Sequence, residues 1–542
     1  MDILFGSVTG TAENIARDAA RVAKSRGHDV RLCELDEVTM EDLADMNDVL
    51  VVISTYGEGE MPFNAETFWD ELEASEPVLK KVSYGVLALG DTAYEMFCQA
   101  GKDIDARFEE LGATRRLARI DCDLNFEKDA AAWIDRAIPQ KGDAAPRTGD
   151  AETMPVPATA APSATDTKRP PQRWSRANPF PATIVDSRIL SGDGSSKDMR
   201  HITLSIKDSG LAYEAGDSLA IVPTNNPDQV AALLERLGAA PDTLVEGFDL
   251  PLGPLLTSKF EINIPSERLV RAVGAAIKDE ALKAACLGDK AGFDSYLWSK
   301  DVLDVLNVDP RLQVGADVLL SLLQPLQHRA YSIASSPKTH PDEIHLTVAA
   351  VRWDHNGRDH GGVCSTHLAD RLPPGAQADM FMVPNKRFRV PADPDTPMIM
   401  VGPGTGIAPF IAFLQERQET GAIGDAWLFF GDRQRACDHV YEAELQAFQE
   451  AGVLTRLDLA FSRDQDEKIY VQDRMRAASK HVFAALEAGA YVYLCGDAKA
   501  MAPAVDQTLH DIVAKEGGLS PEGAITYITD MRRGGRYLKD VY

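Results

Sequence analysis

Apolar runs of strand length alternate with helix-length stretches through residues 1–140, and this alternation restricts the fold more than any other feature of the chain. The strand-like runs are "DILF", "VRLCEL", "DVLVVIST" and "YGVLALG", and the stretches between them include "AENIARDAARVAKS". Strands that alternate with helices form a parallel sheet with helices on both faces. Residues 1–140 are therefore predicted to form a doubly wound α/β domain.

The rest of the sequence changes pattern three times. Residues 141–176 are rich in Ala, Pro, Thr and Asp and predict a flexible linker, which spans on the order of 35 Å as a random coil. Strand-like runs such as "FPATIVDSRIL" dominate residues 177–395 except for a helical section at about 226–324, which predicts an antiparallel β-barrel with a helical insert. Strands and helices alternate again in residues 396–542, which predicts a second α/β domain.

Composition excludes several classes of protein. The formal charge of −27 argues against nucleic acid as a partner. The chain contains no run of roughly 18 apolar residues and no cleavable leader before its first strand, so we expect a soluble cytoplasmic protein without a membrane anchor. The seven cysteines are scattered and form no CxxC pair, which argues against a disulfide framework, an iron–sulfur cluster or a structural zinc site. No metal site is predicted.

Acidic residues are concentrated in the first domain. Residues 1–140 hold 29 Asp and Glu against 14 Lys and Arg, a net charge of −15, which is more than half of the excess of the whole chain. One interpretation is a solvated surface that promotes solubility. The other is a face that steers a basic protein partner.

Three polar, glycine-bearing loops follow strand-like runs of the first domain, and doubly wound sheets bind ligands at the carboxyl ends of their strands. In "SVTGTAEN", the hydroxyls of Ser7, Thr9 and Thr11 and the amides of the following helix can hold a phosphate without a cation. The loops "STYGEGEMPFN" and "LGDTAYEMFCQAG" bring Tyr56 and Tyr94 to the same edge, where two aromatic rings can enclose a planar ligand. The alternatives are a capped turn and tyrosines that pack against the core.

Cations and hydroxyls recur later in the chain in patterns typical of phosphate binding. The guanidinium of Arg329 in "RAYS" suits a pyrophosphate, and "GVCS" at 362–365 presents amides and a hydroxyl at an expected helix start. The turn "VGPGTGIAP" lets the backbone approach a pyrophosphate. "SRDQDEKIYVQ" places Arg463 and Lys468 close together in an acidic chain, which suits a dianion. Taken alone, Arg329 would form a surface ion pair, and the last group would be a surface charge patch.

In this combination and order, the motifs resemble the diflavin reductase family. Residues 1–140 resemble its flavodoxin domain, and the chain after the linker resembles its FAD/NADPH reductase module. "LGDTAYEMFCQAGKDID", with Asp91 and Cys98, resembles the branch of sulfite reductase flavoprotein (alpha) components more than the NADPH–cytochrome P450 reductases, which tend to carry Asn at both places. The resemblance implies a flavodoxin-like FMN domain, a β-barrel FAD domain and a Rossmann-like NADP domain, with FMN, FAD and NADPH as cofactors.

The resemblance also implies binding residues for FMN. The first loop would hold the 5′-phosphate, and Tyr56 and Tyr94 would flank the isoalloxazine ring. The family's FMN contacts fall on Ser7, Val8, Thr9, Gly10, Thr11, Ala12, Ser54, Thr55, Tyr56, Gly57, Leu89, Gly90, Asp91, Tyr94, Phe97 and Cys98.

For FAD, the family places Tyr331 against the flavin and Ser332 near its N5 atom, and Trp353 replaces the usual Tyr. The implied FAD contacts are Arg329, Ala330, Tyr331, Ser332, Thr347, Val348, Ala349, Trp353, Gly362, Val363, Cys364 and Ser365. For NADPH, the group around Arg463 would bind the 2′-phosphate. The implied NADPH contacts are Gly404, Thr405, Ser462, Arg463, Lys468, Ile469, Tyr470, Val471 and Gln472.

Three residues are implied to gather around the nicotinamide as the catalytic set: Ser332, Cys495 and Asp540. Tyr542 matches the terminal aromatic that covers the FAD ring and yields to the nicotinamide, although a frayed end is the alternative without the family. Relatives often carry an acidic contact near Ala504, which is here either lost or shifted to Asp506.

The implied activity is hydride transfer from NADPH to FAD, single-electron transfer to FMN, and delivery to a haem/iron–sulfur acceptor, with the sulfite reductase haemoprotein (beta component) as the expected partner. A P450 or general haemoprotein reductase is the alternative enzyme, and a non-catalytic, flavin-carrying interaction protein is the alternative of another class. The chain starts directly at the first strand, without the N-terminal extension through which relatives oligomerise. A monomer is therefore expected, unless the N-terminus is trimmed.

Overall fold

The computed structural model describes residues 1–7, 10–56, 59, 61–62, 64–75, 77–90, 96–123, 126–140, 174–176, 178–288 and 290–542. The predicted linker, residues 141–176, lies outside the described residues except for 174–176. The chain divides into two compact units, Met1–Pro170 and Pro171–Tyr542, and each is described by itself.

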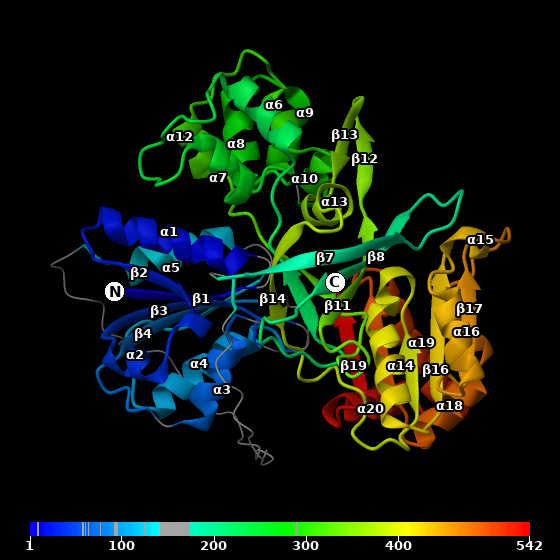
Figure 1. Cartoon of the computed structure of the whole chain (residues 1–542). Helices are drawn as coiled ribbons and strands as arrows, with labels where there is room; N and C mark the ends of the chain where they lie inside the picture. The colour runs from blue at the N-terminus through cyan, green and yellow to red at the C-terminus, as the bar shows by residue number, and fades with distance from the viewer. Residues whose placement is uncertain are drawn as a thin grey trace. The chain divides into compact units, whose positions relative to one another are not determined.

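The first unit is a parallel sheet covered by helices (Figure 1). Its strands are β1 (Asp2–Gly6), β2 (Arg31–Glu34), β3 (Asp48–Ser54), β4 (Ser83–Leu89), β5 (Thr114–Arg115) and β6 (Ile120–Cys122). Its helices are α1 (Thr11–Ser25), η1 (Leu35–Glu37), α2 (Met40–Asp45), α3 (Glu66–Ala74), α4 (Gln99–Glu110) and α5 (Glu127–Ala137). The strand order is β2-β1-β3-β4-β5, and β6 also pairs with β4. The chain therefore winds from β1 first to β2 and then in the opposite direction through β3, β4 and β5, as in a doubly wound sheet.

Each face of this sheet carries its own apolar core, because successive side chains of a strand point to opposite faces. Ile3 and Phe5 pack under α1 and α5 in one core. Leu4 lies between them in sequence and packs under α3 and α4 in the other core. The near-continuous apolar runs of the sequence therefore reflect strands that are buried on both sides.

The second unit begins with an antiparallel barrel. Its strands are β7 (Phe180–Ile189), β8 (Asp198–Ser205), β9 (Ser218–Ile221), β10 (Arg329–Ser332), β11 (Glu343–Ala350) and β14 (Gln377–Val383), in the order β10-β9-β14-β7-β8-β11. A bridge between Ile333 and Leu346 joins the two ends of this order, so the sheet closes on itself. The short helix α13 (Val363–Thr366) and the π-helical turn η2 (His367–Arg371) pack against the apolar barrel interior.

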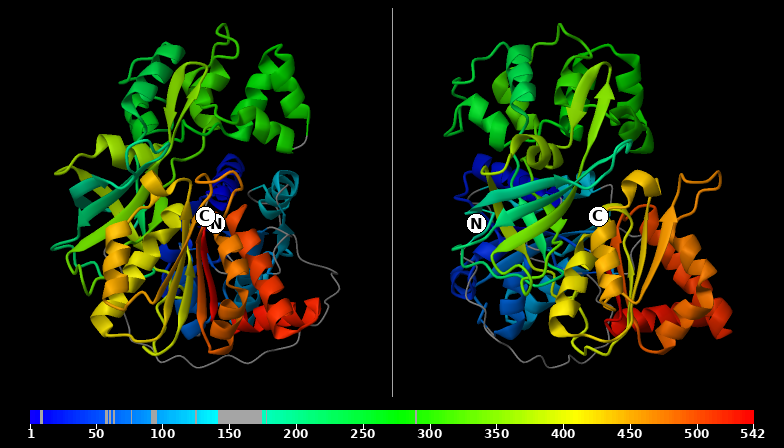
Figure 2. Two further views of the ribbon diagram at one scale, coloured as in Figure 1. Left: turned by 90° about the vertical axis from the view of Figure 1, so that its right-hand side faces the viewer. Right: turned by 45° about the vertical axis from the view of Figure 1, so that its right-hand side comes forward.

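Between β9 and β10 the chain forms a cluster of helices with its own apolar core. These helices are α6 (Pro227–Leu237), α7 (Leu252–Ser258), α8 (Glu267–Ala276), α9 (Glu280–Leu287), α10 (Lys290–Leu297), α11 (Val302–Leu306) and α12 (Ala316–Leu322). The hairpin of β12 (Arg352–His355) and β13 (Arg358–Gly361) extends from the barrel beside this cluster (Figure 2). The insert therefore touches the strand that carries Trp353.

The C-terminal part of the second unit is another parallel sheet, with the order β17-β16-β15-β18-β19. Its strands are β15 (Met398–Val401), β16 (Ala426–Asp432), β17 (Arg456–Phe461), β18 (Tyr491–Gly496) and β19 (Tyr537–Val541). Its helices are η3 (Gly404–Ile407), α14 (Ala408–Thr420), α15 (Arg435–Asp438), α16 (Glu442–Glu450), α17 (Val471–Ala477), α18 (Ser479–Glu487), α19 (Met501–Gly517) and α20 (Pro521–Arg533).

These sheets confirm the predicted fold class: a doubly wound domain, an antiparallel barrel with a helical insert, and a second α/β domain. Among the described helices, none is both long enough and apolar enough to cross a membrane.

Candidate functional site

The loop between β1 and α1 has the geometry of an anion site. Gly10 adopts a left-handed conformation (φ 83°) that a side chain would strain, and α1 begins at the next residue, so no side chain at the cap position satisfies its first amides. The Ser7 amide donates to Asn64 Oδ1 at 2.8 Å, while the buried Ser7 hydroxyl has no partner among the described residues. A phosphate bound at this helix N-terminus would accept hydrogen bonds from the first amides of α1 and from the Ser7 hydroxyl.

The predicted loops after β3 and β4 meet the first loop at one sheet edge. The Ser54 hydroxyl donates to the Gly6 carbonyl at 3.4 Å, and the Thr55 amide donates to the Leu89 carbonyl at 2.9 Å. The start of α4 is tied to the same edge, because the Ala100 amide donates to the Thr55 hydroxyl at 3.3 Å. The described parts of the three loops therefore lie together.

Other predicted FMN residues differ in exposure. Tyr56 is 41% exposed, Phe97 is partly buried, and Cys98 is buried. Cys98 has a positive φ of 56° just before α4, a conformation that is uncommon outside glycine and is found at ligand sites. Gly90 approaches Cys98 so closely that a Cβ would lie 2.7 Å from the Cys98 amide nitrogen. The predicted residues Val8, Thr9, Gly57, Asp91 and Tyr94 lie outside the described residues.

Strand β10 carries the predicted "RAYS" motif. Arg329 lies 3.5 Å from the buried carboxylate of Glu261 and donates to the Gln327 and His328 carbonyls, both at 3.1 Å. Burial raises the pKa of Tyr331 well above its ordinary value, so its phenol stays neutral. Arg371 ends the turn η2, which packs against the barrel interior, and its buried Nε atom has no partner among the described residues. The Arg371 Nη2 atom donates to the Thr224 and Val363 carbonyls, so Arg329, whose side chain is 36% exposed, is the better placed guanidinium for a diphosphate.

The remaining predicted FAD residues lie on β11, β12 and α13. The Thr347 hydroxyl is hydrogen-bonded to the Tyr441 hydroxyl at 2.7 Å, which ties the barrel to the C-terminal sheet. Trp353 donates its ring N–H to the Ser299 carbonyl at 2.9 Å and stacks on His360 with centroids 5.4 Å apart. Val348 lies in the barrel core, and Ala349 borders a pocket.

Helix α13 begins after Gly362, as the sequence predicted, and Val363, Cys364 and Ser365 are buried in it. The Ser365 hydroxyl accepts from the Val351 amide at 3.2 Å, so this hydroxyl holds the end of β11. Burial raises the pKa of the Cys364 thiol to about 11, which keeps it neutral.

The three predicted catalytic residues come together. Ser332 ends β10, whereas Cys495 on β18 and Asp540 on β19 are register partners in the C-terminal sheet. The Ser332 hydroxyl donates to Asp540 Oδ2 at 2.6 Å, and the Cys495 thiol donates to the same oxygen at 3.8 Å. Burial raises the pKa of Asp540, and burial together with the nearby Asp540 carboxyl raises the pKa of Cys495.

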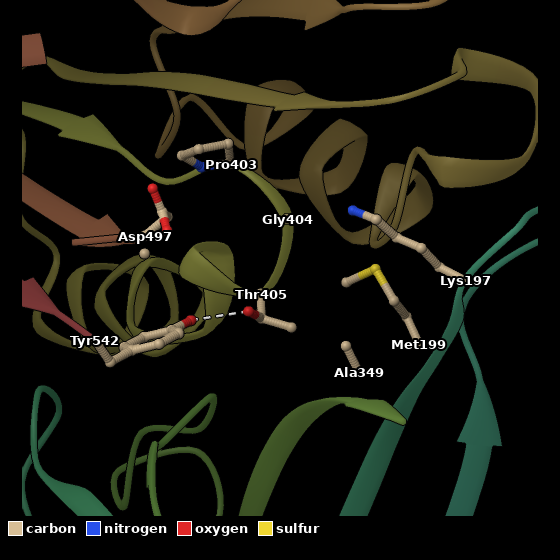
Figure 3. A pocket seen from close by; sticks show the side chains of 9 residues that line it. Lys197, Met199, Ala349, Pro403, Gly404, Thr405, Asp497 and Tyr542 are labelled. Atoms are coloured by element: carbon tan, nitrogen blue, oxygen red, sulfur yellow. Dashed lines mark hydrogen bonds between the residues drawn. The ribbon is translucent and has the colours of Figure 1, made fainter. Parts of the chain in front are cut away.

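A pocket of about 390 Å³ lies between the barrel and the C-terminal sheet (Figure 3). Its lining residues are Lys197, Met199, Ala349, Pro403, Gly404, Thr405, Gly496, Asp497 and Tyr542. The hydroxyls of Tyr542 and Thr405 are hydrogen-bonded at 2.8 Å across it (Figure 3). The Tyr542 amide donates to Gly496, and its carbonyl accepts from Ala498, so the terminal residue is held in place rather than frayed.

The glycines of "VGPGTGIAP" serve two purposes: some allow close packing of the turn, and one lines the pocket. A Cβ on Gly406 would lie 2.2 Å from the Cys495 carbonyl oxygen, and a Cβ on Gly402 would lie 2.4 Å from the Gly406 carbonyl oxygen. These two glycines therefore allow close packing of the turn. Gly404, with φ 60°, lines the pocket and is the one that can approach a ligand.

The predicted 2′-phosphate group lies on the loop after β17. Arg463, Lys468 and Tyr470 are exposed, and among the described residues the side chains of Arg463 and Lys468 form no ion pair. Ile469 and Val471 pack against the core of the C-terminal sheet, which fixes the end of the loop. Ser462 is tied to β16 through its amide, which donates to the Asp432 carbonyl at 2.9 Å, and Gln472 is partly buried in α17.

Sequence reasoning missed several residues that shape these sites. Lys197 extends into the pocket and forms an ion pair with the buried Asp432 on β16. Asn64 holds the Ser7 amide, as described above. Asp506, the candidate for a shifted acidic contact, is instead bound by Arg532 and Lys539. Only a signal for contacts between distant residues could have revealed these pairs.

Three families match successive parts of the chain. A flavodoxin family matches residues 3–133, an FAD-binding domain matches residues 172–251 and 264–367, and an oxidoreductase NAD-binding domain matches residues 400–507. The order of these families agrees with the order of the described sheets. The Ser7 hydroxyl, which has no partner among the described residues, fits FMN, and the Arg329 guanidinium on β10 fits FAD. Arg463 and Lys468, which form no ion pair among the described residues, fit NADPH.

Curated relatives match the chain over its whole length. The chain is 41% identical to the "Sulfite reductase [NADPH] flavoprotein alpha-component" of Bacillus subtilis, with 100% of this chain and 89% of the relative covered. It is 39% identical to the protein of the same name from Vibrio cholerae, with 87% of that relative covered, and 39% identical to the one from Cronobacter sakazakii, with 89% covered. The chain therefore belongs to the diflavin reductase family, in the branch of NADPH-dependent sulfite reductase flavoproteins, and is an oxidoreductase that uses FMN, FAD and NADPH.

Proposed function

We propose that this chain delivers electrons from NADPH to the haem- and iron–sulfur-containing component of sulfite reductase. The names of the relatives support this acceptor, since they describe the alpha-component of an NADPH-dependent sulfite reductase. Cytoplasmic location and a monomeric state stay predictions of the sequence.

The observation that carries the redox part of the proposal is the convergence of Ser332, Cys495 and Asp540. Ser332 comes from the barrel and Asp540 from the last strand, yet they share a 2.6 Å hydrogen bond. Tyr542 lies two residues beyond Asp540 and borders the pocket. A hydride donor bound in this pocket would lie between the two parts of the second unit, which is where transfer from NADPH to FAD requires it.

The residues of this set have distinct proposed roles. The two flavins, when bound, supply the conversion of an electron pair into single electrons. Asp540 Oδ2 accepts hydrogen bonds from Ser332 and Cys495, which would hold both polar groups in place beside a bound nicotinamide. Tyr542 covers the flavin side of the pocket and must move for the nicotinamide to enter. The hydrogen bond that its hydroxyl forms with Thr405 is a small barrier to that motion.

The remaining assignments are part of the same proposal. The loops around Ser7, Tyr56 and Cys98 hold FMN, the "RAYS" and "GVCS" segments hold FAD, and the loop with Arg463 and Lys468 holds the 2′-phosphate of NADPH. The corresponding domains are residues 1–140, 177–395 and 396–542, joined by the linker at 141–176.

The acidic first domain supports a basic acceptor. Its net charge of −15 would attract a positively charged docking face, and such steering weakens as salt screens it. Within the domain, Arg115 and Arg119 both pair with the buried Asp105, so part of the positive charge of the domain is neutralised internally.

The test is an acceptor comparison. The flavin-loaded chain is mixed with NADPH and either a sulfite reductase haemoprotein or a cytochrome P450, and haem reduction is followed spectroscopically. We expect fast reduction of the haemoprotein, sulfide formation from sulfite, and a rate that falls as salt rises. Equal or faster reduction of the P450 would replace this proposal with a general haemoprotein reductase.

A further inference from the structure

Three potential metal ligands meet at the turn between β10 and β11. His340 lies on the turn, and Glu343 and His345 lie at the start of β11. Glu343 Oε2 is 3.2 Å from His345 Nε2 and 3.9 Å from His340 Nδ1. One ligand atom from each residue can be chosen so that all three lie within 4.8 Å of one another.

These distances suit a tetrahedral ion. Ligands bound to Zn²⁺ at about 2.0–2.2 Å lie roughly 3.4 Å apart along an edge of the tetrahedron. The separations of 3.2 and 3.9 Å bracket that value, so small side-chain rotations bring the three atoms onto one ion. Two imidazoles and one carboxylate are also a common zinc donor set.

The group is open on one side only. The side chain of His345 is 9% exposed, whereas those of His340 and Glu343 are 30% and 38% exposed. The buried side fixes the position of the group, and the open side admits an ion and a water as fourth ligand. This is the arrangement of a three-ligand site with one free position.

Neighbouring hydrogen bonds hold the turn in place. The His345 amide donates to the Ser335 hydroxyl at 3.0 Å, and the buried Tyr213 hydroxyl is bonded to that same hydroxyl at 2.8 Å and to the Glu343 carbonyl at 2.9 Å. The His340 amide donates to the Ser336 carbonyl at 2.8 Å. The ligand-bearing backbone is therefore ordered before any ion arrives, which lowers the entropic cost of binding.

The described part of the chain contains a second group of this kind, which differs in a decisive way. Asp301, Asp304 and His360 also lie close together, but Arg358 pairs with Asp301 at 2.5 Å and with Asp304 at 2.7 Å. Its guanidinium already occupies the position that an ion would take. Among the residues that the structure describes, no Lys or Arg forms an ion pair with Glu343, whose ionic partners are His340 and His345.

We propose that His340, Glu343 and His345 bind one divalent transition-metal ion of the zinc type, with water as the fourth ligand. The ion would join the β10–β11 turn to β11, the strand that carries Thr347. The site is separate from the pocket at Tyr542 and does not depend on the proposed electron acceptor.

The test is calorimetric titration of the flavin-loaded full chain with ZnCl₂ after removal of metals with EDTA. The parent should bind one Zn²⁺ per chain. His340→Ala and Glu343→Ala, which alter partly exposed side chains, should each weaken that binding by on the order of 100-fold or more, since even outer-shell changes cost 10- to 100-fold. His481→Ala, which removes an exposed histidine of α18, is the matched control and should bind as the parent does.

Flavin content and circular dichroism of each variant establish that it is folded. The proposal is overturned if the parent shows no saturable Zn²⁺ binding, or if either variant binds as tightly as His481→Ala. Zinc-edge anomalous scattering from soaked crystals should place a single peak between the three side chains, and a peak elsewhere would also overturn it.

Discussion

The carboxyl group of Asp540 holds two other polar groups in place, the Ser332 hydroxyl and the Cys495 thiol. Its Oδ2 atom accepts from Ser332 at 2.6 Å and from Cys495 at 3.8 Å, and burial raises its pKa. A buried carboxyl is costly unless its hydrogen bonds are made, and here both donors come from residues expected around the nicotinamide. The group is therefore well placed to respond to charge that develops during hydride transfer.

Replacement of Asp540 by Asn keeps an oxygen that can accept from Ser332 but removes the ionisable group. We expect flavin reduction by NADPH to slow by about a hundredfold, the scale of a positioned acid or base, with FAD content unchanged. Stopped-flow absorbance of the flavins measures this rate. Asp511→Asn, on the exposed face of α19, is the control. A normal rate in Asp540→Asn would remove the residue from the catalytic set.

Asp36 gives a pH prediction for the first unit. It accepts from the Phe68 amide at 2.9 Å, and burial raises its pKa from 3.8 to about 7. Between about pH 4 and 7, Asp36 keeps its proton in the folded state but has lost it in the unfolded state. The contribution of Asp36 to the free energy of unfolding therefore falls as the pH rises from about 4 to 7. Below that window its contribution is fully present.

Asp36→Asn keeps the acceptor for Phe68 and removes the titration. The urea midpoint of the parent minus that of the variant should therefore decrease from pH 4 to 7 and level off above it. FMN release from the full chain, seen as a rise in fluorescence, reports unfolding of the first unit. A pH-independent difference would show that Asp36 titrates normally in the fold.

At the scale of elements, the loop between β17 and α17 has one stretch that is exposed to solvent and an end that is packed against the core of the C-terminal sheet. Ile469 and Val471 are packed, while Arg463 and Lys468 face solvent without an ion pair among the described residues. Exposed cations without partners are free to bind a dianion.

The double variant Arg463→Ala with Lys468→Ala tests the 2′-phosphate assignment. The KM for NADPH should rise on the order of a hundredfold, as expected for two lost hydrogen bonds to a charged group, while kinetics with NADH stay unchanged. Steady-state cytochrome c reduction measures both. Lys480→Ala with Arg533→Ala removes the same charge from other exposed positions. Equal losses with both coenzymes would contradict the assignment.

Elements were easier to predict than the contacts between them. Strand runs and the polar loops after them follow from local periodicity, so the three sheets and the β1–α1 loop were predictable. The meeting of Ser332 with Asp540 came from a family resemblance, because 208 positions separate the two residues. The pairing of Lys197 with Asp432 and the role of Asn64 had no local signal. Cysteine spacing gives no signal for His340, Glu343 and His345, which come together only when the turn between β10 and β11 folds.

At the scale of the whole molecule, the division into two compact units makes the first one a candidate for independent folding. It has its own sheet and two apolar cores, one on each face. We expect residues 1–140, produced alone, to fold and retain yellow FMN. In this fragment, Asn64→Ala should weaken FMN binding by about tenfold, because the Ser7 amide loses its acceptor. A folded but colourless parent fragment would contradict the FMN assignment.

Within the second unit, the barrel and the C-terminal sheet are joined by polar contacts such as Ser332 with Asp540 and Thr347 with Tyr441. These contacts limit how modules can be exchanged between relatives. A chimera with its crossover near residue 396 would combine parts from two different relatives, and a mismatch at the Thr347–Tyr441 pair would leave a buried hydroxyl unsatisfied. Swaps at the boundary between Pro170 and Pro171 transfer the whole reductase part as one block and keep all of these bonds. Engineers who want a new electron acceptor should therefore recombine there.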